Sequence, residues 1–187
     1  MSVKQSVSLV LVWRIAELEA RQLKSDMIEP VHLLLALAKC VDVDLTNIVS
    51  KEAEDHDEIL EQLLREVRRV RTVFRRANVD AKLLRRQLRK AAPVLRFAIA
   101  KPGVLHRSTA AKKIFAEAKR FAAISDQTVY PIHLLLSGLI AHDQLSSEVM
   151  RDIGIDQKAF QETANSAVFA LKRRGVSFEG DSKLGHN

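Results

Sequence analysis

The chain has 187 residues, of which 47% are apolar, 5% aromatic and 28% charged. Six glycines and four prolines are too few for an all-β protein of this length, and one cysteine excludes a disulfide framework. The formal net charge of +7 allows contact with phosphates or acidic protein surfaces, and the composition as a whole predicts an all-α protein.

The N-terminal segment is short and mildly apolar, and it lacks the basic start and small-residue cleavage site of a signal peptide. No window approaches the roughly 18 uninterrupted apolar residues of a membrane-spanning helix. We therefore expect a soluble, cytoplasmic protein with no membrane partner. Cys40 follows an apolar run, which favours a small buried side chain over a reactive one.

Four helices are predicted in the first part of the chain. The first covers about residues 5–23, and the second opens at Pro30, because proline has no amide hydrogen to leave unpaired at the first helical position. A short third helix is expected at about 44–51. The fourth starts after Asp55, which stands at capping-box spacing from Glu58, and it extends through an arginine-rich stretch.

This basic stretch continues into a further predicted helix at about residues 80–91. Between Arg65 and Lys90, eleven basic residues stand against two acidic ones, so the stretch carries +9 and the rest of the chain −2. A regular apolar stripe along it favours a solvated or protein-facing helix, with nucleic acid as the alternative partner. The candidate basic patch consists of Arg68, Arg69, Arg75, Arg76, Arg85, Arg86 and Arg89.

An internal repeat organises the chain. The sequence Pro-Val-His-Leu-Leu-Leu at 30–35 reappears as Pro-Ile-His-Leu-Leu-Leu at 131–136, an offset of 101 that continues downstream without a gap. Upstream the offset is 102, where Trp13 matches Phe115. A competing alignment at an offset of 76 would place an insertion inside the first copy, and we adopt the gapless alignment here.

The second copy should repeat the helices of the first. We expect them at about 108–124, from Pro131, at about 146–152 and after Asp156, with Gly154 supplying the turn before the last helix. The expected organisation is a single domain over 1–174, with repeat 1 at 5–76, an inter-repeat helix and linker at 77–106, repeat 2 at 107–174, and a flexible tail at 175–187.

The duplicated unit, with a serine opening its first helix and His-Leu-Leu-Leu in its second, resembles the Clp N-terminal (Clp repeat) domain over about residues 5–173. The resemblance implies a compact all-α pair of four-helix units related by a pseudo-twofold axis. It also implies a chaperone or protein quality control role, in which the domain docks substrates or adaptors for a Clp-type AAA+ unfoldase. The segment 42–45 is in addition similar to the N-domains of type VI secretion Clp ATPases, which bind a helix of the contracted sheath.

The sequence departs from this family at the second helix, where the usual Thr-Glu-His is Pro-Val-His at 30–32 and Pro-Ile-His at 131–133. Acidic residues near this point help some relatives to recognise phosphorylated arginine, and the missing glutamates put that ability in question. The inter-repeat segment is also longer and more basic than is usual in the family.

Catalytic motifs are missing from the sequence. None of the six glycines begins a Walker A loop, so the chain is not itself the ATPase motor. His32 and His133 occupy equivalent positions, which favours one structural role repeated in each copy over metal binding. With no nucleophile and base pair, we expect neither enzymatic activity nor a cofactor or metal.

The leading interpretation is a non-catalytic protein-binding module, either a detached N-domain or a stand-alone regulator. Expected partners are protein substrates or adaptors, a Clp-type AAA+ ATPase or a type VI sheath component, with the chain a monomer or a weak homodimer. The alternative is a basic helical protein that associates with nucleic acid. The candidate docking residues lie along the seam between the two units and are Ser6, Leu9, Val10, Trp13 and Ser108.

Overall fold

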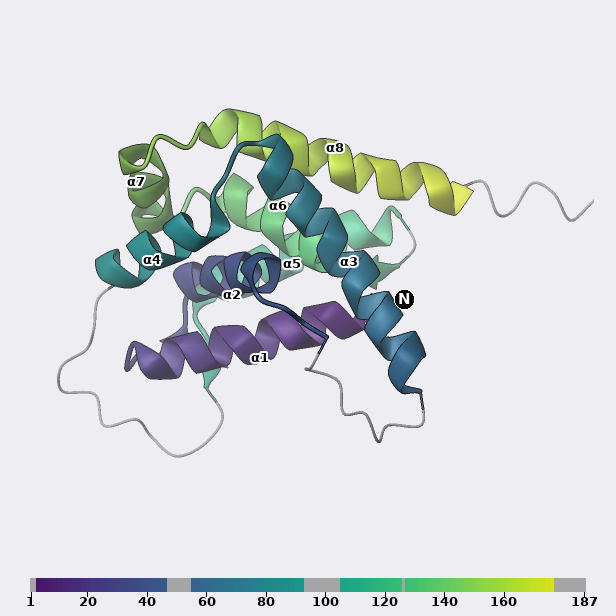
Figure 1. Ribbon diagram of the computed structural model, residues 1–187, viewed down its shortest axis with the longest axis horizontal. Helices are drawn as coiled ribbons and strands as arrows, with labels where there is room; N and C mark the ends of the chain where they lie inside the picture. The colour runs from purple at the N-terminus through teal and green to yellow at the C-terminus, as the bar shows by residue number, and fades with distance from the viewer. Residues whose placement is uncertain (1–2, 47–54, 93–104, 126, 177–187) are drawn as a thin grey trace, which may run out of the picture.

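The computed structural model describes residues 3–46, 55–92, 105–125 and 127–176. Within these ranges the chain forms eight α-helices and four strands of two residues each (Figure 1). The all-α class expected from the sequence is therefore confirmed. Across the same ranges, no helix is both long and apolar enough to cross a membrane.

The helices lie close to their predicted positions. The first half contains β1 (Lys4–Gln5), α1 (Val7–Gln22), β2 (Met27–Ile28), α2 (Pro30–Asp42), α3 (His56–Arg76) and α4 (Ala81–Ala91). The second half contains β3 (His106–Arg107), α5 (Thr109–Ala123), β4 (Thr128–Val129), α6 (Pro131–Ala141), α7 (Gln144–Asp152) and α8 (Gln157–Val176). The short helix predicted at 44–51 and the tail predicted at 175–187 lie largely outside the described residues.

Matching side chains begin the first helix of each half. The Ser6 hydroxyl accepts the Leu9 N–H at 3.3 Å, and the Ser108 hydroxyl accepts the Ala111 N–H at 3.2 Å. Each bond satisfies an amide that has no partner inside its helix. The serines therefore fix where α1 and α5 begin.

The acidic caps of the later helices are less uniform. Asp156 accepts the Ala159 N–H at 3.0 Å, as the sequence predicts. The capping box predicted for Asp55 and Glu58 is wrong, because the Asp55 side chain makes no capping bond. Its backbone, at φ −106° and ψ 29°, is not in the extended conformation typical of an N-cap.

The two helices that follow the prolines form the centre of the molecule. Most residues of α2 and α6 are buried, as expected of helices that are apolar on most of their surface. They contact each other, with α1 packed on α2 and with α8 and α5 packed on α6 (Figure 1). The conserved order of elements in both halves thus surrounds a single core.

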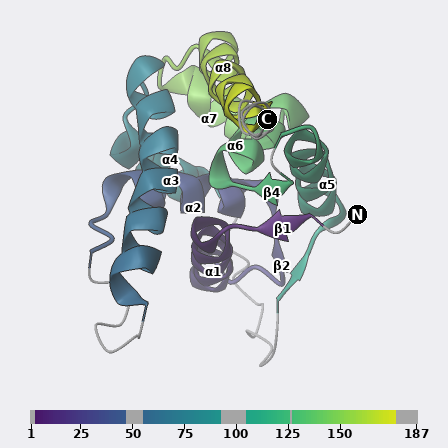
Figure 2. The same ribbon diagram turned by 90° about the vertical axis from the view of Figure 1, so that its right-hand side faces the viewer.

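The short strands interlock the two halves. β1 pairs in parallel with β4, Lys4 lying opposite Thr128, and β3 pairs in parallel with β2, His106 lying opposite Met27 (Figure 2). In each case the strand before the first helix of one half pairs with the strand before the second helix of the other. This exchange is what a pseudo-twofold axis between the halves requires.

The turn between α3 and α4 has the same hydrogen bonds as the turn between α7 and α8. The Val79 N–H donates to the Phe74 carbonyl at 2.8 Å, and the Ile155 N–H donates to the Met150 carbonyl at 2.8 Å. Each bond joins a residue to the carbonyl five positions earlier, as in a Schellman motif, where the residue just before the donor is left-handed. The two turns are therefore structurally equivalent at an offset of 76.

The left-handed residues and the following caps agree with this equivalence. Asn78 has φ 54° and Gly154 has φ 74°, and asparagine is one of the few other residues that tolerate this region. Asp80 and Asp156 then cap α4 and α8. The helix expected between the copies is present, and we infer that it is the counterpart of α8, which favours the alignment at 76 over the gapless one.

Candidate protein-docking site

The candidate docking residues at the start of the first helices differ in exposure. Leu9 is fully buried in the hydrophobic core, and the two capping serines, Ser6 and Ser108, are only 2% and 8% exposed. An exposed docking role is therefore wrong for these three residues in this conformation. Val10 is 47% exposed and Trp13 is half-buried, so these two remain open to a partner.

An aromatic contact joins the two halves beside these residues. The rings of Trp13 and Phe115 meet edge to face, with centroids 6.0 Å apart. The Arg107 guanidinium lies 5.1 Å from the first ring centroid and 5.0 Å from the second. Because Trp13 and Phe115 are equivalent positions of the repeat, their contact lies at the pseudo-twofold axis.

Apolar side chains on α1 extend this contact to the surface. Val7 is 36% exposed and Val10 is 47% exposed, and both precede Trp13 at three-residue spacing on one side of the helix. We refer to Val7, Val10 and Trp13 as the first-helix patch. Exposed aliphatic side chains beside a guanidinium and an indole suit an apolar segment of another polypeptide.

Part of the candidate basic patch is engaged inside the molecule. Arg89 on α4 forms two hydrogen bonds to the carboxylate of Glu19 on α1, at 2.8 and 2.5 Å, and Lys39 lies 3.5 Å from the same group. Glu19 is only 1% exposed. Burial alone would raise the pKa of Glu19, but the bonds and charges of Arg89 and Lys39 lower it below its ordinary value.

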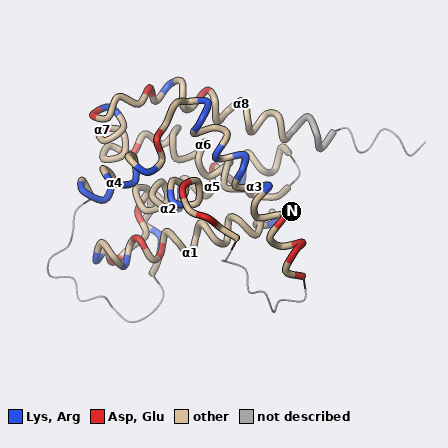
Figure 3. The backbone as a smooth tube through the Cα atoms, in the orientation of Figure 1, with Lys and Arg blue, Asp and Glu red and all other residues tan. Residues whose placement is uncertain are grey.

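Two further arginines of the patch have partners within the fold. Arg85 forms an ion pair with Asp42 at 2.9 Å, and the guanidinium of Arg69 lies 5.3 Å from the ring centroid of Tyr130. The side chains of Arg68, Arg75, Arg76 and Arg86 are exposed. Figure 3 places the basic residues of α4 at one end of the molecule and those of α3 beside α6 and α8. The seven arginines therefore do not form one continuous face.

A groove between α3 and α8 is a surface that the sequence analysis missed. Its volume is about 190 Å³. One wall is formed by Arg69, Val73 and Arg76 of α3, and the other by Ala167 and Leu171 of α8. The wall of α8 was visible as small residues at helical spacing, but its opposite wall lies about ninety residues earlier in the chain.

The two repeated histidines act on the backbone. Nδ1 of His32 accepts the Glu29 N–H at 2.9 Å, and Nδ1 of His133 accepts the Tyr130 N–H at 3.2 Å. Burial lowers the pKa of His32 to about 4, although the charge of Glu19 raises it in part. His32 is therefore neutral near pH 7, and both histidines cap the helix that the preceding proline opens.

The single cysteine is a buried thiol. Burial raises the pKa of Cys40 to about 12, so its thiol stays protonated near neutral pH. In the part of the chain that the structure describes, no cluster of three or more His, Cys, Asp or Glu side chains could hold a metal ion.

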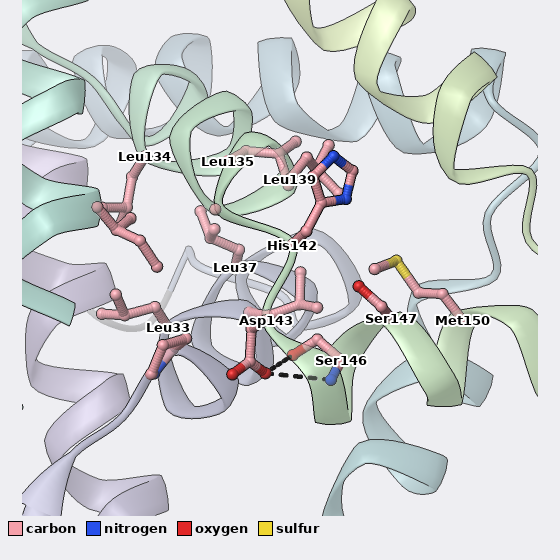
Figure 4. A pocket seen from close by; sticks show the side chains of 14 residues that line it. Leu33, Leu37, Leu134, Leu135, Leu139, His142, Asp143, Ser146, Ser147 and Met150 are labelled. Carbon is pink, nitrogen blue, oxygen red and sulfur yellow. Dashed lines mark hydrogen bonds between the residues drawn. The ribbon is translucent and has the colours of Figure 1, made fainter. Parts of the chain in front are cut away.

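A small apolar cavity lies where α2, α6 and α7 meet (Figure 4). Its volume is about 20 Å³, close to that of a single water probe. Leu37, Leu139 and Met150 line it, and the Asp143 carboxylate caps α7 at its edge by accepting the Ser146 N–H at 3.1 Å. This cavity is too small for a ligand and is a packing feature.

No protein-family model matches the sequence, and no curated protein matches it. Solved structures do. The Hsp104 N-terminal domain from Candida albicans is 17% identical, with a TM-score of 0.56, over 86% of this chain and 89% of that one. The N-terminal domain of the caseinolytic protease associated chaperone ClpD from Arabidopsis thaliana is 19% identical, with a TM-score of 0.50, over 87% and 92% of the two chains.

A third similar structure comes from structural investigations of a malarial protein secretion system. It is 17% identical, with a TM-score of 0.55, over 89% of this chain and 95% of that one. Because the sequence identities are this low, the three comparisons establish the fold alone. The chain therefore has the fold of a Clp N-terminal domain, as its resemblance to that domain predicts.

Proposed function

We propose that the protein is a non-catalytic docking module that binds polypeptide segments for a Clp-type AAA+ unfoldase. The observation that carries the proposal is the shared fold, which extends over most of this chain and of an Hsp104 N-terminal domain. Substrates and adaptors of such an unfoldase are the partners that this fold supports.

The first-helix patch supplies a surface for this function. Val7 and Val10 expose aliphatic side chains beside Trp13, where the two halves meet. An unfolded client presents apolar segments that a folded protein buries, and such a patch removes their side chains from water. We therefore assign client binding to this face.

Binding to fluorescently labelled casein, followed by fluorescence anisotropy, tests the proposal. Val10→Asp should weaken binding about tenfold, because it places a charge in an apolar contact. Leu18→Asp is the matched control, since Leu18 is 53% exposed on the same helix, more than two turns away. Its effect should stay below about twofold.

Size-exclusion chromatography with the Clp-type ATPase of the same organism tests the link to an unfoldase. We expect co-elution of the chain with the hexamer or with a complex of hexamer and client. If the wild-type chain binds neither casein nor the ATPase, the docking function is overturned.

A further inference from the structure

We propose that the groove between α3 and α8 binds an acidic amphipathic helix of a partner protein. This inference rests on the docking function proposed above, and it adds a second surface and the chemistry of its partner. The groove is separate from the first-helix patch, since neither α1 nor α5 contributes to its lining.

The shape of the groove follows from the spacing of its walls. Arg69, Val73 and Arg76 recur at four and three residues and therefore line one face of α3. Ala167 and Leu171 stand four residues apart on one face of α8. The small side chains of Ala167 and Ala170 on α8 leave the space between the two helices open.

The buried residues of the two walls form an apolar floor. Val73 and Leu171 are buried, with 1% and 9% of their surface exposed, and Ala167 is half-buried. Leucine-type side chains at positions i, i+3 or i+4 and i+7 of an incoming helix would remain in contact with this floor over two turns. A volume of about 190 Å³ suits one or two such side chains.

The charge of the rim selects the partner. Arg69 and Arg76 lie in the groove, and Arg68 and Arg75 are exposed on the adjoining surface of α3. The groove-lining residues include no acidic side chain. Aspartate or glutamate flanking the apolar positions of the partner would pair with these guanidinium groups, which steers association and fixes orientation.

The probe is a synthetic amphipathic helix of roughly 15 residues, about four turns, with leucines on one face and glutamates elsewhere. Its binding to the full chain is followed by fluorescence anisotropy at low and high salt. We expect binding that weakens as salt rises. A peptide with lysine at every glutamate position should bind at least about tenfold more weakly.

Charge reversal locates the site. Arg76→Glu should weaken peptide binding about tenfold, whereas Arg86→Glu should change it less than about twofold. Arg86 is the matched control, because it is an exposed arginine on α4 that lies outside the groove. Ala170→Asp, on the opposite wall, should also weaken binding. Circular dichroism should show wild-type helix content for all three variants.

Other occupants give different outcomes. Equal weakening by Arg76→Glu and Arg86→Glu, with single-stranded DNA binding more tightly than the acidic peptide, would assign the arginines to nucleic acid and overturn the proposal. Wild-type self-association in analytical ultracentrifugation that Arg76→Glu abolishes would assign the groove to a second copy of the chain, with the same consequence.

The two proposals fail separately. If the acidic peptide does not bind while casein does, and casein binding remains sensitive to Val10→Asp, the groove assignment is wrong and the docking function stands. If Val10→Asp and Arg76→Glu each reduce only their own ligand, both surfaces are supported.

Discussion

The fourth helices of the two halves, α4 and α8, are attached to the core in different ways. The helix α4 buries Ala81, Leu84 and Leu88, and Arg85 and Arg89 add ion pairs to α2 and α1. The twenty residues of α8 bury the ring of Phe160 and a longer apolar stripe. The shorter helix thus adds ion pairs to its apolar contacts, whereas the contacts of its longer counterpart include a fully buried aromatic ring.

The positions that face these helices have changed accordingly. Glu19, which receives Arg89, corresponds at an offset of 102 to Phe121, a half-buried ring packed against the core. Arg89 corresponds at an offset of 76 to Asn165, which is exposed. The two halves therefore share one backbone arrangement but differ in the side-chain interactions at the last helix, which include an ion pair in the first half.

The largest effect should come from the apolar side of this comparison. Phe160→Ala removes a fully buried ring that contacts Phe74, and it should lower the free energy of unfolding by about 4 kcal/mol. Urea unfolding followed by circular dichroism measures this loss. Because no titrating group is removed, the loss should be the same at pH 7 and pH 5; a strong pH dependence would contradict an apolar attachment.

The next effect concerns His32, which lies near the buried acid of the first half. Its pKa falls from 6.5 to about 4 in the folded chain, so the unfolded state binds the proton first as pH falls. The contribution of neutral His32 to the free energy of unfolding should be fully present above pH 6.5. The free energy of unfolding should then drop by about 3 kcal/mol between pH 6.5 and pH 4. Urea unfolding over this range should show the slope.

A glutamine at this position separates the capping bond from the titration. His32→Gln keeps an acceptor for the Glu29 N–H but has no proton to gain, so the slope should become shallower. An unaltered slope in His32→Gln would mean that another group causes it.

Much of this fold could be predicted from the sequence, because its signals are local or repeated. Proline followed by histidine marks the start of α2 and α6, and serines mark the start of α1 and α5. The match of Trp13 with Phe115 could also have indicated the aromatic contact, since equivalent residues near a twofold axis can meet. Periodicity placed α4 as well, although not its relation to α8.

What could not be predicted depends on contacts between distant residues. Strands of two residues have no period to detect, and β1 pairs with a strand more than a hundred residues away. The bond between Glu19 and Arg89 spans 70 residues. The groove depends on how α3 packs beside α8. The equivalence at an offset of 76 is hard to recognise for a local reason, because Asn78 adopts a left-handed conformation that the sequence marks clearly only at Gly154.

The ion pair of α4 should contribute less than the ring of α8. Arg89→Ala leaves Glu19 buried beside Lys39 alone, and the free energy of unfolding at pH 7 should fall by about 2 kcal/mol. The figure is below that for a fully buried pair because the Arg89 side chain is 38% exposed. Arg86→Ala, on the same helix, should cost less than about 0.5 kcal/mol.

The pH dependence of the stability of Arg89→Ala tests whether Arg89 acts through Glu19. The pKa of Glu19 is lowered in the folded chain, so its contribution is present above pH 4.5 and is lost as pH falls through the folded pKa. The difference in free energy of unfolding between wild type and Arg89→Ala should therefore become smaller below pH 4.5. A difference that stays constant there would show that Arg89 acts through packing of its methylene groups.

The smallest expected change in stability concerns a difference between the two central helices, α2 and α6. Gly138 of α6 stands at the position of Leu37 in α2, and Leu37 lies against the cavity that the glycine borders. A Cβ placed on Gly138 meets no atom within 4 Å. Gly138→Ala should therefore raise the free energy of unfolding by about 1 kcal/mol, mostly because alanine loses less backbone entropy in a helix.

Gly138→Leu should lower the free energy of unfolding, because a cavity of about 20 Å³ has room for a methyl group but not for a second leucine beside Leu37. Thermal unfolding of the two variants gives the signs. If both are stabilising, the α2–α6 crossing does not require one small residue and one large one, and the asymmetry between the halves does not extend to their centre.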